Sequence, residues 1–178
     1  MIDLYNEYCK SYIGLNDENS YGFLDCVSDL LNTDEIQCLK QYEQHLEIDR
    51  LQHITSVAYI AYIIAKELNC DYRAASRAAV MHDLVYYDWR NGETGKWHRL
   101  HGYRHPKLAC LNAEELCGQI SDKEHNIILR HMWPLTAIPP KYKEGWIVTF
   151  SDKYCAFFEV LYSTSDKFKT KFLKDIGK

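Results

Sequence analysis

The sequence has little proline and no cysteine pair spaced for a zinc ribbon. Only four prolines occur among 178 residues, and three of them lie in the single segment "WPLTAIPP". Because proline interrupts helices, most of the chain is free to be helical. The seven cysteines are odd in number and form no C-x-x-C motif. Their pattern argues against a disulfide framework and predicts reduced thiols in a cytoplasmic protein.

A basic excess and a long apolar run are also missing. The net charge is −4 and the isoelectric point is about 6.0. We therefore expect no nucleic-acid polymer as a partner, since such binding relies on lysine and arginine. The longest apolar run, "SVAYIAYIIA", is too short to cross a bilayer, and the start "MIDLYNEYCK" has no signal-peptide pattern. We expect no membrane partner, whereas a pocket for a small anion is compatible with this charge.

The apolar residues repeat with the period of a helix, which predicts an all-α fold. No segment alternates apolar and polar residues for long enough to indicate a sheet. We expect one domain over residues 1–178, with an N-terminal helical extension (1–44), a core of five or more helices (45–160) and a C-terminal helix (161–178). Ser165 is expected to cap that last helix, and Pro106 fits the first turn of an earlier one.

Histidines and aspartates lie on the apolar faces of several expected helices. His53 precedes Val57 and Ala61 at helical spacing, and the other members of the set occupy similar positions or the flank or start of a helix. The set comprises His53, His82, Asp83, His105, His131 and Asp152.

The six side chains favour a metal site when they are considered together. A lone buried histidine is more often a hydrogen-bonded core residue than a ligand. Burying Asp83 and Asp152 in one core, however, is costly without a positive partner, and we expect no lysine or arginine on the same faces. Imidazole with carboxylate suits Fe, Mn, Co or Zn better than Mg. Six ligands exceed what one catalytic ion needs, so we predict one or two divalent transition-metal ions.

The ordered set of histidines and aspartates resembles the HD-domain superfamily of metal-dependent phosphohydrolases. The dipeptide His82-Asp83 is a weak signal by itself. The resemblance gains strength from the segments "HITSVA", "AAVMHDL", "HPKLA", "IILRHMWPLT" and "SDKYCA", and it covers roughly residues 44–159. Segments like "YDW", "HGYRHP" and "HMWPLT" are similar to those of a bacterial HDIG-like group that mostly lacks an assigned substrate.

The resemblance implies a helical bundle, a site and a reaction. It implies that His53, His82, Asp83 and Asp152 hold a first metal, and that His105 and His131 hold a second one bridged by Asp83. The nucleophile would be a metal-activated hydroxide. The implied function is a phosphomonoesterase or phosphodiesterase that acts on a small phosphorylated substrate such as a nucleotide.

Two other functions remain open for the same residues. Some HD proteins use such a set in a mixed-valent di-iron oxygenase, which is the first alternative. The second is that this chain is a non-catalytic module that binds a metal or a ligand. The chain also departs from many HD nucleotidases, because Tyr86 stands where they have a glutamate three residues after the HD aspartate. The resemblance leaves the roles of Asp88 and His45, and the oligomeric state, unassigned.

Several further residues are candidates for substrate binding or packing. Lys153 adjoins Asp152 and could reach a substrate phosphate, while His101 and Arg104 precede His105 and could line the mouth of the site. We expect the aromatic residues in "AFFEVLY" to pack in the core. The segment "KFKTKFLK" is expected to be a solvated helix face rather than a membrane contact.

Overall fold

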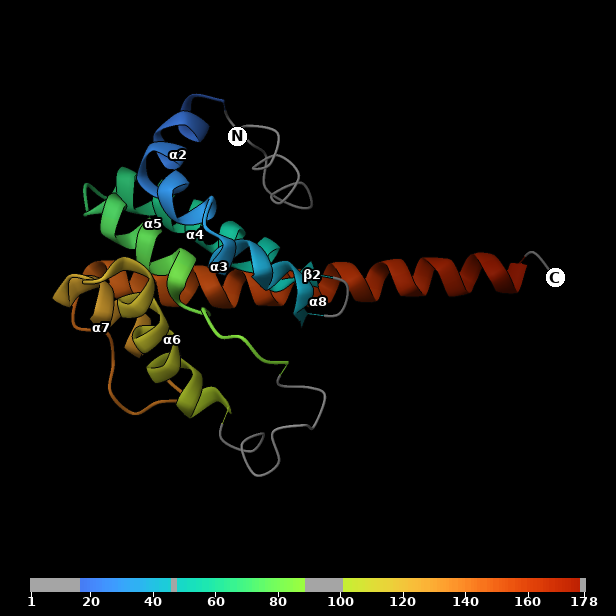
Figure 1. Cartoon of the computed structure of the whole chain (residues 1–178). Helices are drawn as coiled ribbons and strands as arrows, with labels where there is room; N and C mark the ends of the chain where they lie inside the picture. The colour runs from blue at the N-terminus through green and yellow to red at the C-terminus, as the bar shows by residue number, and fades with distance from the viewer. Residues whose placement is uncertain (1–16, 46–47, 89–100, 177–178) are drawn as a thin grey trace.

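The protein is a bundle of helices around one apolar core. The computed structural model describes residues 17–45, 48–88 and 101–176 (Figure 1). The elements are α2 (Asp17–Leu31), α3 (Asp34–Gln37), η1 (Cys38–Gln41), β1 (Glu43–His45), β2 (Ile48–Asp49), α4 (Arg50–Glu67), α5 (Tyr72–Met81), α6 (His101–Cys117), α7 (Asp122–Arg130) and α8 (Lys143–Ile176). The prediction of an all-α fold is confirmed, since the only sheet in the described ranges is the short pair β1–β2.

Side chains at the helix starts explain where several helices begin. Asp49 caps α4 by accepting from the backbone of Gln52, whose side chain accepts in turn from the backbone of Asp49. A capping box formed by Ser121 and Glu124 opens α7 in the same way. Gly118, with a φ of +72°, follows the end of α6, as expected for a residue in the left-handed region.

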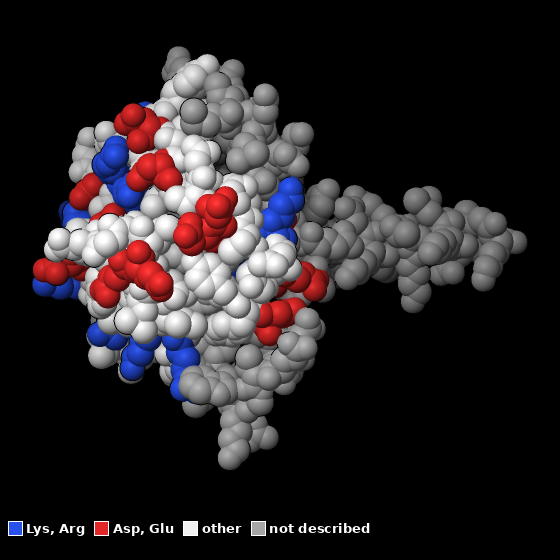
Figure 2. Space-filling model, viewed as in Figure 1, with Lys and Arg blue, Asp and Glu red and all other residues white. Residues whose placement is uncertain are grey.

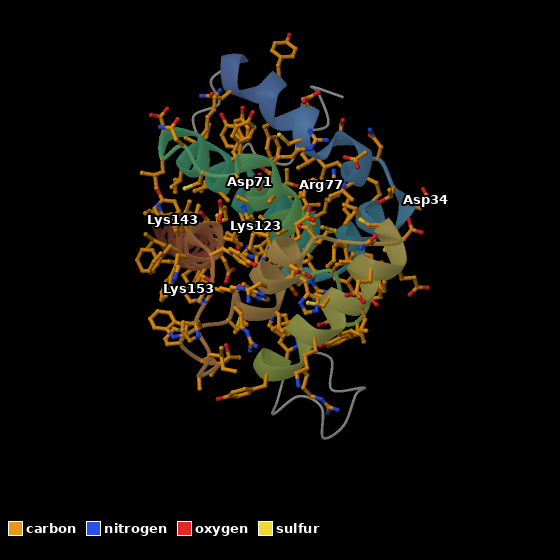
Figure 3. All side chains as sticks on the ribbon, turned by 90° about the vertical axis from the view of Figure 1, so that its left-hand side faces the viewer. Asp34, Asp71, Arg77, Lys123, Lys143 and Lys153 are labelled. Atoms are coloured by element: carbon orange, nitrogen blue, oxygen red, sulfur yellow. The ribbon has the colours of Figure 1, made fainter. Side chains whose placement is uncertain are left out.

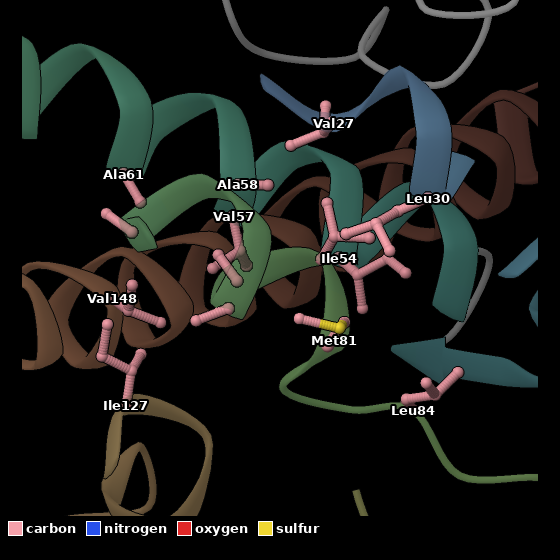
Figure 4. Packing of buried hydrophobic residues seen from close by; sticks show 14 of the residues in the cluster. Val27, Leu30, Ile54, Val57, Ala58, Ala61, Met81, Leu84, Ile127 and Val148 are labelled. Carbon is pink, nitrogen blue, oxygen red and sulfur yellow. The ribbon is translucent and has the colours of Figure 1, made fainter. Parts of the chain in front are cut away.

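The core lies where α4, α5, α7 and α8 meet. In Figure 4, Val57 and Ala61 of α4 lie in the same packed cluster as Val148 of α8 and Ile127 of α7. Alanines at 75, 78 and 79 are fully buried. Small side chains let helices approach closely, so α5 can pack along α4 and bring its last turn into the centre of the bundle.

The structure corrects several expected boundaries. Helix α5 ends at Met81, so His82 is its C-cap. Pro106 lies inside α6, which begins five residues earlier than its predicted first turn. Ser165 does not cap a separate helix, because α8 runs without a break from Lys143 to Ile176.

Charged side chains join the helices at the surface. Arg77 of α5 lies 2.7 Å from Asp29 of α2 and 3.6 Å from Glu124 of α7. Figure 2 shows acidic and basic side chains spread over one face of the body. Within the described residues, no helix combines the length and apolar character needed to span a membrane.

Candidate metal centre

All six predicted ligand residues converge in the interior of the bundle. They come from α4 (His53), the end of α5 (His82 and Asp83), α6 (His105), the end of α7 (His131) and α8 (Asp152). The four histidines and Asp83 are buried, and the side chain of Asp152 is 14% exposed. The site is therefore assembled by tertiary packing of separate helices rather than by one local motif.

Hydrogen bonds to the backbone fix the orientation of three imidazole rings. The Nδ1 atoms of His82, His105 and His131 donate to the carbonyls of Ala79, His101 and Ile128, at 2.7, 2.9 and 2.7 Å. A carbonyl can only accept, so each Nδ1 carries a proton, and in the neutral ring Nε2 keeps a lone pair. The Nε2 atoms of His105 and His131 lie 2.9 Å from each other. Because these Nε2 atoms face the shared interior, the three rings are set up as ligands.

His53 is oriented by a carboxylate instead. Its Nδ1 lies 3.0 and 2.9 Å from the two oxygens of Glu159, which is fully buried on α8. A carboxylate behind a histidine fixes the ring and raises the basicity of its other nitrogen. Glu159 escaped the sequence analysis, although its position seven residues after Asp152 places it on the same helix face.

The two aspartates lie among the Nε2 atoms. Asp152 Oδ1 is 3.3 Å from His53 Nε2 and 3.8 Å from His82 Nε2. Asp83 reaches the remaining rings, with Oδ2 at 3.7 Å from His82 Nε2 and Oδ1 at 3.2 Å from His105 Nε2. Asp83 thus presents one oxygen to each side of the cluster.

The donor atoms fit a pair of transition-metal ions. His53 Nε2 and His82 Nε2 are buried and make no hydrogen bond, which is costly for polar atoms unless something else binds them. Two overlapping groups have ligand atoms that all lie within 4.8 Å of one another: His53, His82 and Asp83, and Asp83, His105 and His131. A third group joins His82, His131 and Asp152. The mixture of imidazole and carboxylate donors suits Fe, Mn, Co or Zn.

Burial and neighbouring charges act differently on the six side chains. Burial lowers the pKa of His53 and of His82, but the carboxylates of Glu159, Asp83 and Asp152 outweigh it and raise both, whereas His131 and the two aspartates are held in the forms that bind metal. The pKa of His131 falls to about 3, because burial and the nearby rings of His82 and His105 disfavour its cation. Burial raises the pKa of a carboxyl, but the surrounding histidines outweigh it and hold the pKa of Asp83 and of Asp152 well below the usual range. Neutral imidazole and ionised carboxylate are the forms that coordinate metal.

Gln44 and Arg50 support Asp83, and the sequence analysis missed both. Gln44 on β1 donates from Nε2 to Asp83 Oδ2 at 2.7 Å, and Arg50 donates from Nε to Gln44 Oε1 at 2.9 Å. Arg50 is almost fully buried and also donates to the carbonyl of Val85 at 2.6 Å. The expectation of no basic residue on these faces was wrong: Arg50 lies one turn before His53, and that spacing could have revealed it.

The predicted substrate-binding residues lie at different distances from the cluster. Lys153 Nζ donates to the carbonyl of His131 at 3.1 Å and lies 3.7 Å from Asp152 Oδ2. His101 stacks on His105 with ring centroids 4.5 Å apart and meets the hydroxyl of Tyr87 at 2.8 Å. Arg104 is exposed on the same helix, and its charge acts on Tyr87, the partner of His101.

The sequence analysis assigned no role to Tyr86, Asp88 and His45, and the structure describes the surroundings of the first two. Tyr86 is exposed, and burial of part of the ring raises its pKa to about 12 beside Cys38 and Glu35. It therefore stays a neutral phenol and is no substitute for a carboxylate. Asp88 is half-buried at the end of the described segment. The side chain of His45 lies outside the described residues.

The comparisons with known proteins agree with this arrangement. Residues 50–156 match the HD domain family, and this range contains all six converging residues. Searches of curated proteins and of solved structures return no match. The family match covers more than half of the chain, so the chain belongs to the HD domain family, whose members are in general metal-dependent hydrolases.

Proposed function

We propose that this chain is a metal-dependent phosphohydrolase that cleaves a small phosphoester, with nucleotides as the first substrate class to test. The observation that carries the proposal is the convergence of four anchored histidines and two carboxylates in one buried cluster. The Nε2 atom of His82 is buried without a hydrogen bond, which is costly at the centre of a core unless something else binds it.

The six residues would hold two cations. His53, His82 and Asp152 would serve one, His105 and His131 the other, and Asp83 would serve both through its two oxygens. When bound, such cations lower the pKa of a water molecule, orient the substrate and neutralise phosphoryl oxygens. Glu159, Gln44 and the three backbone carbonyls keep the ligands in place, so that the site needs little rearrangement on loading.

Residues around the cluster would bind the phosphoryl group. The carbonyl of His131 holds the ammonium of Lys153 next to Asp152, where its charge can meet a phosphate oxygen. The pair formed by Tyr87 and His101 offers polar atoms on the α6 side. Arg104 remains a candidate that rests on the sequence. It lies on the exposed face of α6, where only a larger substrate would reach it.

A phosphate-release screen tests the proposal. Protein stripped of metal and reloaded with Mn, Co, Fe or Zn is incubated with phosphomonoesters and phosphodiesters, and released phosphate is measured. We expect release from at least one substrate class and a loss of about 100-fold or more in His82→Ala. His125→Ala is the matched control, because His125 is half-exposed and lies outside the cluster.

Two outcomes would contradict the proposal. One is phosphate release that persists in His82→Ala, which would point to a contaminant. The other is the absence of release together with oxygen uptake by iron-loaded protein, which would favour the oxygenase.

A further inference from the structure

Arg50, in the first turn of α4, is a buried cation that holds two separate parts of the chain. It is 1% exposed. Its Nε donates to Gln44 Oε1 at 2.9 Å, and its Nη1 donates to the carbonyls of Val85 and Tyr87 at 2.6 and 3.2 Å. A guanidinium can do this because its donors point in fixed, divergent directions. Since the side chain is buried, Arg50 acts on the protein around it and not on a bound substrate.

The first arm of contacts from Arg50 ends at Asp83. Gln44 accepts from Arg50 through its oxygen and donates through Nε2 to Asp83 Oδ2 at 2.7 Å. These two partners fix the orientation of the amide, because a guanidinium can only donate and an ionised carboxylate can only accept. With Oδ2 held in this way, Asp83 Oδ1 lies 3.2 Å from His105 Nε2. The first arm therefore sets the direction in which Asp83 presents its second oxygen.

The second arm ends at His105. Arg50 holds the backbone carbonyls of Val85 and Tyr87, and the hydroxyl of Tyr87 meets His101 Nδ1 at 2.8 Å. The ring of His101 stacks on that of His105 with centroids 4.5 Å apart, and the carbonyl of His101 accepts from His105 Nδ1 at 2.9 Å. The orientation of His105 thus depends on a chain of contacts that starts at Arg50.

The other side of the cluster is supported from α8. Glu159 lies 2.9 Å from His53 Nδ1, and His53 Nε2 lies 3.3 Å from Asp152 Oδ1. Glu159 is on the buried face of α8, whereas Phe157 is 63% exposed, so the expectation that the aromatics of "AFFEVLY" pack in the core is wrong for Phe157. The arms from Arg50 run instead through β1 and the segment after α5. The two sides of the cluster are therefore held by different parts of the chain.

The two proposed ions would depend on Arg50 to different degrees. Of the three side chains assigned to the second ion, two, Asp83 and His105, stand at the ends of the arms. The first ion shares Asp83 but has three further ligands at which neither arm ends. Loss of a partner that orients a ligand weakens metal binding. Loosening both arms would therefore disturb most ligands of the second ion and a minority of those of the first.

We propose that Arg50 is a positioning residue for the second ion, the one assigned to Asp83, His105 and His131. The inference rests on the proposed function in its assignment of two cations to the six side chains, and it does not depend on which phosphoester is cleaved. Replacing Arg50 should release the second ion while the first stays bound.

Metal analysis and electron paramagnetic resonance of manganese-loaded protein test the proposal. Wild-type protein should hold about two ions per chain and give the spectrum of a magnetically coupled pair. Arg50→Lys keeps the charge but loses the divergent donors. It should bind the second ion about 10-fold to 100-fold more weakly and give the spectrum of an isolated Mn(II) ion. Gln44→Met, which cuts only the first arm, should also release the second ion before the first, and it serves if Arg50→Lys does not fold.

Arg77→Lys is the matched control for the loss of a buried guanidinium. Arg77 also donates to a carbonyl and to a carboxylate, those of Cys26 and Asp29, at 3.0 and 2.7 Å, but between α5 and α2. This variant should keep both ions and the coupled spectrum. Thermal unfolding of the two lysine variants shows whether a similar loss of stability leaves the ion pair intact.

The same change in His105→Ala protein shows which ion Arg50 supports. His105→Ala should bind only the first ion, and adding Arg50→Lys should leave its affinity within about twofold, because the two changes act on the same ion. Adding Glu159→Gln should lower that affinity about 10-fold, since His53 loses its carboxylate.

Three results would overturn the proposal. The first is Arg50→Lys or Gln44→Met protein that keeps both ions as tightly as Arg77→Lys. The second is a loss of the first ion on adding Arg50→Lys that equals the loss on adding Glu159→Gln. The third is wild-type protein without an ion pair, which would also remove the two-cation assignment. An intact pair without phosphate release would instead contradict only the proposed reaction.

Discussion

Individual residues at the site are held by partners that are themselves buried. The rings of His82, His105 and His131 are tied to carbonyls in the turn before each ring, so their orientation follows from the helix that carries them. Asp83 has no such local partner. Its Oδ2 depends on Gln44, which comes from β1, 39 residues away in sequence. The carboxylate proposed to bridge two ions is thus the one most dependent on distant structure.

Replacing Gln44 should loosen the centre without unfolding the protein. Gln44→Met keeps the side-chain length but removes the donor to Asp83 and the acceptor for Arg50. We expect metal affinity to fall about 10-fold to 100-fold, as is typical when a partner of a ligand is lost. Competition with a chromophoric chelator measures this. Gln119→Met on the exposed surface should leave the affinity unchanged. Equal affinities for the two variants would show that Gln44 does not position Asp83.

Neighbouring tyrosines should differ in their effect on turnover. Tyr87 contacts His101 beside the cluster, whereas the charged neighbours of Tyr86 are Cys38, Glu35 and Glu115, none of them a ligand. Tyr87→Phe should raise KM for the phosphoester several-fold, by about 1 kcal/mol of lost hydrogen bonding. Tyr86→Phe should leave kcat and KM within about twofold, because a phenol with a pKa of about 12 carries no charge at neutral pH. Steady-state kinetics of both variants decide. A larger loss in Tyr86→Phe would place that residue in the reaction.

Among the secondary-structure elements, the contacts between the starts of α5, α7 and α8 fix how these helices, and the candidate ligands they position, are oriented relative to one another. Asp71 caps α5 by accepting from the backbone of Ala74 at 3.0 Å. Glu144 accepts from the backbone of Asp71 at 2.9 Å, and Lys123 of α7 lies 2.9 Å from Asp71 Oδ2 (Figure 3). This group of charged side chains therefore holds together the starts of α5, α7 and α8. His82 and His131 follow directly after α5 and α7, and Asp152 lies within α8, so the same contacts help to place all three.

Removing Glu144 should destabilise this junction. Glu144→Ala leaves the backbone N–H of Asp71 without its acceptor and takes one carboxylate from Lys123. We expect the free energy of unfolding to fall by about 1–3 kcal/mol. Urea denaturation followed by circular dichroism measures it. Glu67→Ala, at the exposed end of α4, should change it by less than about 0.5 kcal/mol. A Glu144→Ala variant as stable as Glu67→Ala would mean that the cluster contributes nothing.

Over the whole molecule, local sequence patterns predicted the helices and the candidate ligands. They predicted less well the helix boundaries and the side chains that hold the ligands from distant parts of the chain. His53, His131 and Asp152 were identifiable because each follows or precedes apolar residues on one helix face, and the structure brings them together. Arg50 and Glu159 also lie on these helix faces, three residues before His53 and seven residues after Asp152. The sequence analysis missed them because it expected no further charged side chain in the core. Gln44 has no local signal, since it lies on the short strand β1 and its partner Asp83 is 39 residues away in sequence. Ser165 is a reasonable cap by local preference, yet α8 continues through it.

Metal content is the most direct test of the central claim, that six converging side chains form a two-metal centre. Protein loaded with Mn or Fe and freed of excess ions is analysed by mass spectrometry of the metal, beside His105→Ala and Asp83→Ala. The account predicts about two ions per wild-type chain, about one in His105→Ala, and less than one in Asp83→Ala. Wild-type protein that retains no more metal than Asp83→Ala would contradict it.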